Sequence, residues 1–432
     1  MPTLALTLIV ISLAPFALYL ALKRPLIFPF GLYLMMVPFD GVIGATKVTA
    51  IVAGLTGGAL VFNMLLTRRV LAPPKSWTGW ALYTLLASLT ALWTIDSLNT
   101  INAVVTLLQL FIFYTILCVY PVERADLRIA GATVVASGTF ISLFGLLSYA
   151  QGFRTQEDRL SVTLNGLLID PNHIAAGLLL PLALAVGTLV ETRNIWLRLG
   201  SAVSAVIMLA ALFLTGSRGG LIALAVMLLF LAWKTRYRLQ ILALMGIGGI
   251  ASLLQPTVWD RFADKGLGAG SGRLFIWNAG GLALKDHWFA GAGLGAFPAA
   301  YNHELLAMYQ PVFQGWSRPA HNAVLSAAVE LGIFGAVLLL YACWRTWCDA
   351  RGNVIIEAAL VGLAVASMFL DVMLFKYIWL ALSMSALVKN AAEPKFLRGM
   401  RRQPPPAGSG KVSARVPAWR GARLSAAQRK YP

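Results

Sequence analysis

Hydrophobic runs separated by short polar connections recur along the whole chain. Most runs are about 16–20 residues long, which is enough, or nearly enough, to cross a bilayer as a helix. In lipid every backbone amide needs a partner within its own segment, so each run is predicted to be helical. The pattern therefore predicts an all-α fold, a polytopic transmembrane helical bundle with 12–13 spans. The predicted spans are 3–21, 26–42, 48–66, 77–95, 100–120, 129–150, 173–190, 196–215, 219–233, 239–254, 322–344, 354–370 and 377–390.

Composition supports this class and excludes an ordinary soluble domain. Hydrophobic residues make up 59% of the chain and charged residues only 12%, and the mean hydropathy is +0.75. Soluble domains carry about twice that share of charge. The first run, 3–21, is followed by no small-residue cleavage site, so we interpret it as a span and not as a removed signal peptide.

The distribution of basic residues predicts the orientation of the bundle. Of the 35 Lys and Arg residues, 25 lie on alternate connections or in the C-terminal tail, and such connections favour the inside of the membrane. The outer face then takes the two longest connections, 151–172 and 255–321. The assignment is self-consistent from residue 22 onwards. It leaves open whether the amino end lies outside or whether one of the first two runs is not a full span.

Positive charge is concentrated in the C-terminal tail. From Lys389 to Pro432 the chain has 11 basic residues and one acid, Glu393, among many Pro, Gly and Ser residues. Such a composition cannot bury a core. We expect a transmembrane domain over 1–390 and a basic, disordered cytoplasmic tail over 391–432 that contacts anionic lipid headgroups. No nucleic-acid-binding motif accompanies the charge, so nucleic acid is not an expected partner.

The outer connection 255–321 is long enough to contain structure of its own. Leu274, Trp277 and Leu284 recur at roughly helical intervals, so we expect short helices within this loop. Long, partly structured loops on one membrane face commonly carry function. The tryptophans of this loop could form an interfacial aromatic belt or stack on sugar rings, and the sequence leaves both roles open.

Four polar groups predicted on the outer face suit work on an anionic substrate. Arg218 precedes a helix whose free amides already favour anions, which predicts a phosphate site, and Arg273 lies in the long loop. His321 begins a span, where the helix dipole helps keep the imidazole neutral and able to accept a proton from a hydroxyl. Asp371 is predicted at the outer end of a later span, where a buried carboxylate needs a partner or a function.

Each of these groups has a structural alternative. Arg218 and Arg273 could be interfacial residues with snorkelling side chains, His321 could be a cap or a packing residue, and Asp371 could pair with Lys376. The functional interpretation rests on convergence, because two arginines, a histidine and a carboxylate are all predicted on one membrane face.

Neither a metal nor a nucleotide is indicated by the sequence. The outer face has no HxxxH or HExxH motif and no acidic cluster, so we expect no metal. The strings "GLGAGSG" and "GAGLGAF" lack both the strand–helix context and the lysine of a phosphate loop. We interpret them as tight turns near the membrane surface. No cofactor is therefore expected.

Five stretches in the second half of the chain form an ordered set around the large outer loop: "DPNHIAAGLLLPL" (170–182), "TGSRGGLIAL" (215–224), "SGRLFIWNAG" (271–280), "HWFAGAGLGAF" (287–297) and "RPAHNAVLSAAVELGIFGAVL" (318–338). In order and spacing they resemble the O-antigen ligase family of bacterial envelope biosynthesis. That superfamily also includes O-antigen polymerases and protein O-oligosaccharyltransferases. One departure is the alanine before the histidine in "RPAHN", where threonine or proline is often expected.

The resemblance implies a helical glycosyltransferase in the bacterial inner membrane, with its active site facing the periplasm. Its donor would be an undecaprenyl-diphosphate-linked glycan and its acceptor a sugar of lipid A-core, with membrane lipids around it and no metal or nucleotide sugar. Carried onto this sequence, Arg218 and Arg273 match the family arginines that bind the donor diphosphate. His321 matches the proposed general base, and Asp371 matches the late acidic residue by position.

The residue types suit this chemistry. Attack at the anomeric carbon needs a group that takes the acceptor proton, and His321 can supply it. Guanidinium groups can stabilise the departing diphosphate. A single displacement would invert the anomeric configuration, which we favour because no nucleophile–base pair is evident. Arg159, Asn172, Asn322 and Trp277 are expected to contact sugar or phosphate.

Two alternatives remain open. A polymerase would use the same donor but extend another lipid-linked glycan; we favour the ligase because of the loop size and the arginine–histidine arrangement. A solute transporter, for example of bicarbonate, should place polar groups at mid-bilayer on broken helices. Glu330 and Glu357 are the candidates for that role, whereas the distinctive groups lie at the predicted outer surface.

Overall fold

The structure is a computed structural model that describes residues 15–39, 46–155, 158–164, 167–253, 272–308 and 315–392. Helices dominate these ranges, and a small antiparallel hairpin joins β1, Thr163–Leu164, to β2, Leu167–Leu168. The helices are α2 Phe30–Met36, η1 Val37–Phe39, α3 Thr46–Thr67, α4 Lys75–Leu89, η2 Thr90–Leu92, α5 Ser97–Val119, α6 Arg124–Ala150, α7 Pro171–Gly177, α8 Leu179–Glu191, α9 Ile195–Leu214, α10 Arg218–Lys234, α11 Arg238–Leu253, α13 Arg273–His287, α14 Phe297–Ala307, α15 Ala323–Ala350, α16 Val354–Ser367 and α17 Lys376–Ala392.

Six stretches of described helix are long and apolar enough to cross a membrane. They belong to α3, α5, α6, the consecutive α7 and α8, α9 and α15. This confirms the predicted class, an all-α polytopic helical bundle. The helices α4, α10, α11, α16 and α17 coincide with predicted spans but are 14 to 17 residues long. The predicted number of 12–13 spans therefore stays a prediction.

The second predicted span, 26–42, is shorter than expected. It contains α2 and η1, which together make one short apolar helix, Phe30–Phe39. Pro29 precedes α2 and Pro38 lies in η1, and proline removes a backbone donor and limits helix length. The first predicted span, 3–21, lies largely outside the described residues, although its described end is helical.

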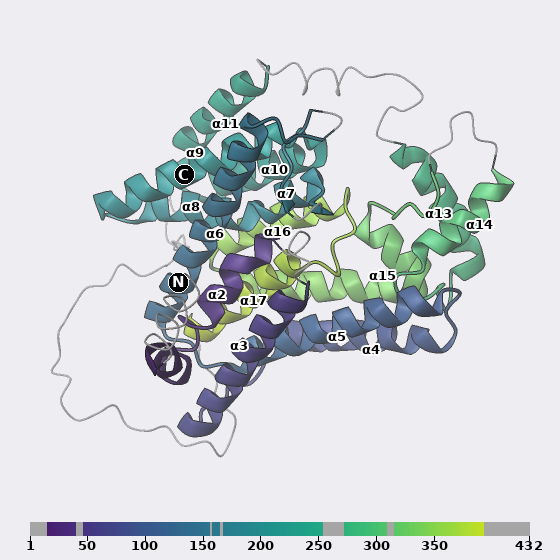
Figure 1. The fold of residues 1–432 in the computed structure, drawn as a ribbon, viewed down its shortest axis with the longest axis horizontal. Helices are drawn as coiled ribbons and strands as arrows, with labels where there is room; N and C mark the ends of the chain where they lie inside the picture. Colours follow the sequence, from purple (N-terminus) through teal and green to yellow (C-terminus); the bar gives the residue numbers. More distant parts are fainter. Residues whose placement is uncertain are drawn as a thin grey trace, which may run out of the picture.

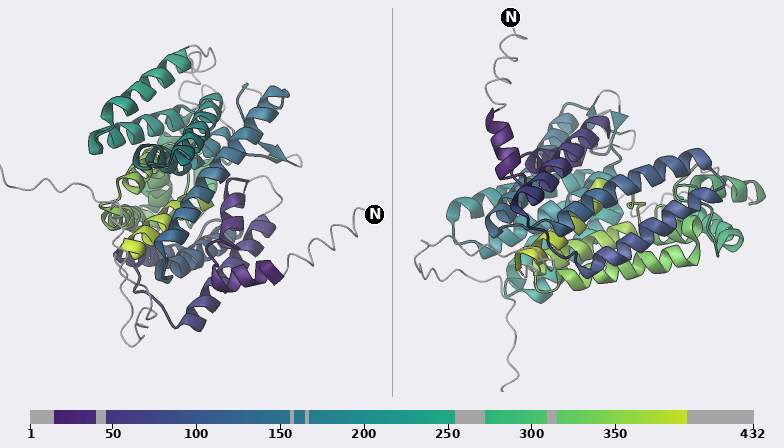
Figure 2. Two further views of the ribbon diagram at one scale, coloured as in Figure 1. Left: turned by 90° about the vertical axis from the view of Figure 1, so that its left-hand side faces the viewer. Right: turned by 90° about the horizontal axis from the view of Figure 1, so that it is seen from below.

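The bundle is organised around three long helices. α4, α5 and α15 run side by side, and α13 and α14 lie at one end of them, against the first part of α15 (Figures 1 and 2). Gly79 lets α4 approach α15, because a Cβ atom there would lie 2.9 Å from the Cα of Ala342. Small residues at such crossings are typical of membrane helix packing. On the other side of the bundle α10 packs along α16, and α8 packs against α9.

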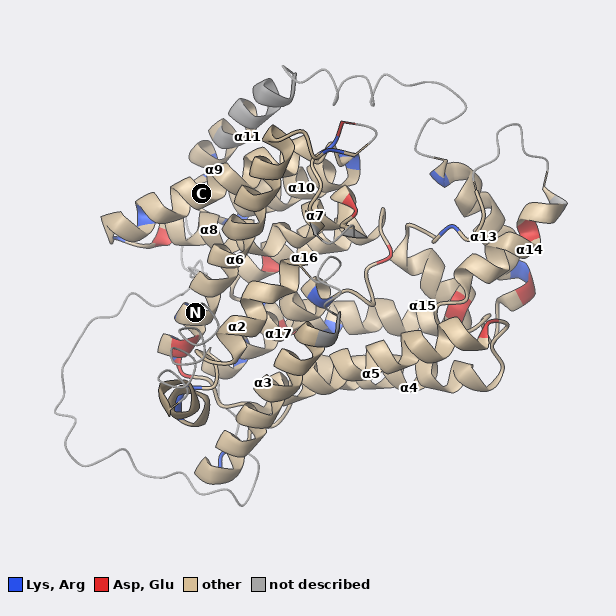
Figure 3. Ribbon diagram, in the orientation of Figure 1, with Lys and Arg blue, Asp and Glu red and all other residues tan. Residues whose placement is uncertain are grey.

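Charged side chains lie mainly at helix ends and in connections, while the helix surfaces are largely uncharged (Figure 3). At the end of the bundle away from α13 and α14, Lys389 forms an ion pair with Asp349, whose Oδ2 also accepts a 2.8 Å hydrogen bond from the amide of Ser76. Residues 391 and 392 still belong to α17, and the rest of the predicted tail, 393–432, lies outside the described residues.

α15 is interrupted one third of the way along. Gly332 has φ 70° and ψ −176°, and the segment that precedes α14 packs into the interruption. The amide of Ala292 donates to the carbonyl of Val329 at 2.8 Å, and the amide of Ile333 donates to the carbonyl of Trp288 at 2.8 Å. Part of the loop predicted to lie at the surface is therefore built into the bundle, and it satisfies the backbone groups that the helix gives up.

Candidate functional site

The predicted site residues come from five separate segments of the bundle: the hairpin with the start of α7, the starts of α10, α13 and α15, and the connection between α16 and α17. Close packing joins these segments. A Cβ atom on Gly220 of α10 would lie 2.6 Å from the Cβ of Ala175 of α7, and one on Gly219 would lie 2.9 Å from the Cβ of Phe369, between α16 and α17. Glycine is required at both positions because any larger residue would separate the elements.

Arg218 and Arg273 each occupy the first position of a helix. Arg218 begins α10, whose start is capped by Ser217 through a 3.2 Å hydrogen bond from the amide of Gly220. Arg273 begins α13, and its guanidinium carbon lies 5.9 Å from the centre of the Phe369 ring. Both arginines are half-buried. Free amides and guanidinium groups at two helix starts make this part of the site suitable for an anion.

His321 is held in a strained backbone conformation at the start of α15. Its φ is 49°, in the left-handed region that costs a non-glycine residue about 1 kcal/mol. The carbonyl of Ala320 accepts a 3.0 Å hydrogen bond from Nε1 of Trp277. Asn322 caps α15 by accepting 3.0 Å hydrogen bonds from the amides of Val324 and Leu325. The backbone on both sides of His321 is thus fixed.

The surroundings of His321 keep its imidazole neutral. Its Nδ1 atom is buried and has no hydrogen-bond partner among the described residues. Burial, together with the positive charges of Arg273 and Arg318, lowers the pKa of His321 to about 4, against the opposing effect of Asp170. A neutral imidazole with an unoccupied nitrogen can accept a proton from a bound hydroxyl.

Asp371 lies in the connection between α16 and α17 and contacts α15. Its Oδ2 accepts a 2.9 Å hydrogen bond from Ser326. Burial raises its pKa to about 6. Asp371, Ser326, Glu330 and Tyr83 line a cavity of about 110 Å³. The carboxylate of Glu330 accepts a 3.3 Å hydrogen bond from the amide of Phe297 and thereby joins α15 to the start of α14.

Arg159 and Asn172 belong to one hydrogen-bonded network. Arg159 is only 9% exposed; its Nε donates to the carbonyl of Thr215 at 2.6 Å and its Nη2 donates to Oδ1 of Asn172 at 3.0 Å. Asn172 in turn donates from its backbone and its side chain to Asp170, at 2.7 and 2.9 Å. The network ties the hairpin and the start of α7 to the turn that presents Arg218.

His173, interpreted from sequence as a helix-start residue, does lie at the start of α7. Its ring stacks on Phe375 with 3.8 Å between ring centres, and its Nδ1 lies 3.1 Å from the hydroxyl of Tyr377. An apolar cavity of about 280 Å³ opens beside it, between α2, α6, α8 and α17. His173 thus separates the polar site from an apolar space.

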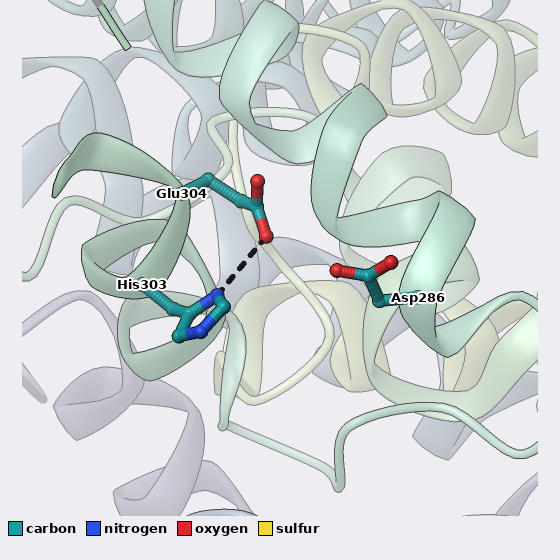
Figure 4. Close-up of side chains that lie close together, drawn as sticks. All are labelled: Asp286, His303 and Glu304. Carbon is teal, nitrogen blue, oxygen red and sulfur yellow. Dashed lines mark hydrogen bonds and ion pairs between the residues drawn. The ribbon is translucent and has the colours of Figure 1, made fainter. Parts of the chain in front are cut away.

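Two features of this end of the bundle were missed by sequence reasoning. Arg318 acts on His321, and its nearness in the motif "RPAHN" was a signal that could have found it. Asp286, His303 and Glu304 come together from α13 and α14, with their ligand atoms within 4.8 Å of one another (Figure 4). The contact between two helices is not visible in the sequence. Asp286 and His303 are exposed, and Nδ1 of His303 lies 3.2 Å from Glu304.

These observations define the class of the protein: a multi-pass membrane protein with a cationic site that contains an imidazole at one end of its helical bundle. Comparison with protein families then supplies the family, because residues 203–340 match the family model described as O-antigen ligase. This match, which includes Arg218, Arg273 and His321, supports the O-antigen ligase family that the motifs predicted. Asp371 lies beyond the matched segment. A search of curated proteins found no match.

The family match supports a general function. It implies a glycosyltransferase-like ligase or polymerase that uses a glycan-linked lipid donor and a lipid acceptor within the membrane. The particular donor, acceptor and residue roles are matters of proposal.

Proposed function

We propose that this protein transfers an undecaprenyl-diphosphate-linked glycan onto lipid A-core at the periplasmic face of the bacterial inner membrane, without a metal or a nucleotide cofactor. The observation that carries the proposal is the environment of His321. Its Nδ1 is buried and has no partner among the described residues, and the charges of Arg273 and Arg318 act on the ring. A neutral base beside guanidinium groups is what attack on a glycosyl diphosphate requires.

In the proposed step, an acceptor hydroxyl oxygen forms a bond to the anomeric carbon of the donor. The bond from that carbon to the diphosphate oxygen breaks, and undecaprenyl diphosphate leaves with the electron pair. The hydroxyl proton passes to a ring nitrogen of His321, which becomes imidazolium. Arg218 and Arg273 bind the diphosphate and stabilise the charge that grows on its leaving oxygen. Because the displacement has one step, it inverts the anomeric configuration.

The other predicted residues act in this proposal by positioning the reacting groups. Asp371 accepts a hydrogen bond from Ser326, which lies in the first turn of α15, and thereby holds the start of the helix that follows His321. Asn322 fixes the backbone beside His321 by capping α15. Arg159 and Asn172 support the turn before Arg218. Trp277 holds the Ala320 carbonyl through its ring nitrogen and leaves its ring faces for a sugar.

A transfer assay with resolved products tests the proposal. Purified protein in detergent is mixed with undecaprenyl-diphosphate oligosaccharide and either lipid A-core or additional donor. Glycan on lipid A-core identifies a ligase, and a lengthened lipid-linked glycan identifies a polymerase, which is the second candidate within the family. His321→Asn should abolish transfer, whereas His303→Asn, which changes a largely exposed histidine of α14, should leave the rate unchanged. Full activity of His321→Asn would exclude the general-base role.

Transport is the less favoured function. The break in α15 at Gly332 lies beside the buried Glu330, as a transporter would require. The backbone at the break is, however, bonded within the protein: the amides of Ala292 and Gly293 donate to the carbonyls of Val329 and Glu330 at 2.8 and 2.9 Å. Glu357 accepts a 2.8 Å hydrogen bond from the amide of Gly352 at the start of α16. These bonds occupy backbone carbonyls that a solute would otherwise contact at the break.

A further inference from the structure

Arg318 has no carboxylate partner among the residues that the structure describes. It is half-buried, and its Nε atom is buried without a hydrogen-bond partner in that part of the chain. A half-buried guanidinium normally finds an anion, because its five donors form a fixed fork that suits phosphate or carboxylate.

The backbone around Arg318 is held rigidly. Ser317 precedes it with φ 55° and His321 follows with φ 49°. Asn302 of α14 accepts a 2.7 Å hydrogen bond from the amide of Ser317 and donates to its hydroxyl at 3.2 Å. Pro319 stiffens the chain directly after Arg318. The loop therefore fixes the backbone position from which the Arg318 side chain extends, and a fixed backbone lowers the entropic cost of binding a ligand.

Arg318 extends from a different element from the other two arginines. Arg273 lies over Phe369, which packs against the start of α10 beside Arg218. Arg318 instead follows the loop fastened to α14: its Cδ lies 3.8 Å from where a Cβ of Gly315 would be, and the Gly315 carbonyl accepts a 3.3 Å hydrogen bond from Tyr301. If Arg273 binds the donor diphosphate beside Phe369, Arg318 remains available to bind the acceptor.

We propose that Arg318 binds an acidic substituent, a phosphate or a carboxylate, on the acceptor glycan near the hydroxyl that attacks. This inference rests on the proposed function and deepens it, because it gives the acceptor site a chemical preference. The guanidinium sits three residues before His321, so the acidic group and the attacking hydroxyl are held by the same short loop. An acceptor with a matching acidic group is selected, and a neutral acceptor leaves the guanidinium unpaired.

The test uses three acceptor glycolipids that share the attacking sugar: one phosphorylated, one carrying a uronate carboxylate, and one neutral. Acceptor KM, donor KM and kcat are measured for the full-length wild type, Arg318→Gln and Arg318→Lys, with Arg154→Gln as the control. Arg154 lies on the same predicted face in an exposed ion pair with Asp158. Binding of each acceptor is measured in parallel without donor, so the preference is tested even where turnover is absent.

The expected wild-type result is an acceptor KM about 10- to 100-fold lower for at least one acidic acceptor than for the neutral one, the range for a charge-assisted hydrogen bond. Arg318→Gln should remove that difference and leave the donor KM unchanged, Arg318→Lys should keep part of it, and Arg154→Gln should keep it all. The phosphate and carboxylate arms show which group is selected.

Three outcomes would overturn the inference. One is a wild type without preference among the acceptors in KM and in binding. Another is an Arg318→Gln protein that keeps the preference. The third is a rise in donor KM alone, which would assign Arg318 to the diphosphate. A wild type that binds acidic acceptors preferentially but transfers glycan to none would instead contradict the proposed function and support the acidic-group preference.

Discussion

The pH dependence of His321 tests the electrostatics of the site directly. Burial and the charges of Arg273 and Arg318 lower its pKa from the usual 6.5 to about 4, while Asp170 opposes the shift and His173 adds to it. At pH 5.5 a group with pKa 4 is about 97% neutral, whereas one with pKa 6.5 is about 9% neutral. The unliganded enzyme should therefore keep its base in the active form well into the acidic range.

A bound donor should change this value. The diphosphate brings negative charge beside the guanidinium groups and removes part of the effect that lowers the pKa of His321. In pH profiles kcat/KM reports the free enzyme and kcat reports the complex. We therefore expect the acid limb of kcat/KM near pH 4 and the acid limb of kcat at a higher pH.

Two measurements check this expectation. The chain has only four histidines, so NMR of protein labelled at histidine, with His321→Asn to assign the resonance, gives the pKa of the free protein. Initial rates of transfer between about pH 3 and 8, a range that extends below the expected pKa, give the two limbs, and Arg154→Gln serves as the control. A His321 resonance that titrates near 6.5, or kcat and kcat/KM limbs that coincide, would refute the reasoning.

The same shift predicts a loss of stability in acid. Because the pKa of His321 is lower in the folded state, the unfolded state takes up the proton first as the pH falls below 6.5. His321 then destabilises the folded state progressively down to its folded pKa near 4, by at most about 3 kcal/mol. Between pH 7 and pH 4 the melting temperature of His321→Asn should fall by less than that of the wild type. An equal fall in both proteins would contradict the lowered pKa of His321.

Three further predictions concern the packing of the site and its independence of metal. Gly332→Ala should prevent folding, because a Cβ atom there would lie 2.1 Å from the carbonyl oxygen of Phe289. Gly200→Ala is the control and should not lower the melting temperature, because no atom lies within 4 Å of a Cβ there. The yield of folded protein and its melting temperature in detergent test this prediction. Asn322→Ala should lower the free energy of unfolding by about 1 kcal/mol, because α15 loses its cap. It should lower kcat while changing KM little, which steady-state kinetics would show. EDTA and His303→Ala should leave the transfer rate unchanged, and a rate lost to EDTA and restored by Zn²⁺ would show that the cluster in Figure 4 holds a required metal.

Helices were predictable where length and hydropathy alone decide them. The helix from Ser97 to Val119 matches the predicted span 100–120, and the Asp96 cap explains the earlier start, since its side chain accepts from the amide of Asn99. The interruption of α15 was not predicted, because "VELGIFG" lies inside a long, mainly apolar run that can continue as a helix. Only the long-range contact with the preceding loop makes the conformation of Gly332 favourable.

The glycines of "GAGLGAF" illustrate the same limit. The sequence interpretation assigned them to tight turns, and Gly291, Gly293 and Gly295 do have positive φ. Their second role is close approach: a Cβ on Gly291 would lie 2.2 Å from the carbonyl oxygen of Glu330, and one on Gly293 would lie 2.1 Å from Oγ1 of Thr94. A turn can be predicted from a glycine, but the partner that the turn packs against cannot.

The site shows which part of a mechanism can be predicted from residue order. Helix starts are local features, so Arg218 and the position of His321 before α15 were predictable. The partner of Asp371 could not be predicted, because Ser326 is 45 positions away in the chain. The two residues meet only because α15 packs against the loop after α16. The charge environment of His321 likewise depends on α7, α13 and the loop before α15 together.

Electrostatic coupling between the substrates follows from this arrangement. In the unliganded site, burial and positive charge lower the pKa of His321 and make the imidazole a weak base. A diphosphate bound by Arg218 and Arg273 would neutralise part of that charge and so strengthen the base only when the donor is present. An acidic acceptor bound by Arg318 would neutralise the rest. The base would then be strongest in the ternary complex, where its proton comes from the acceptor, and weaker when donor alone is bound and water could attack. The same guanidinium groups that bind the substrates thereby favour transfer over hydrolysis.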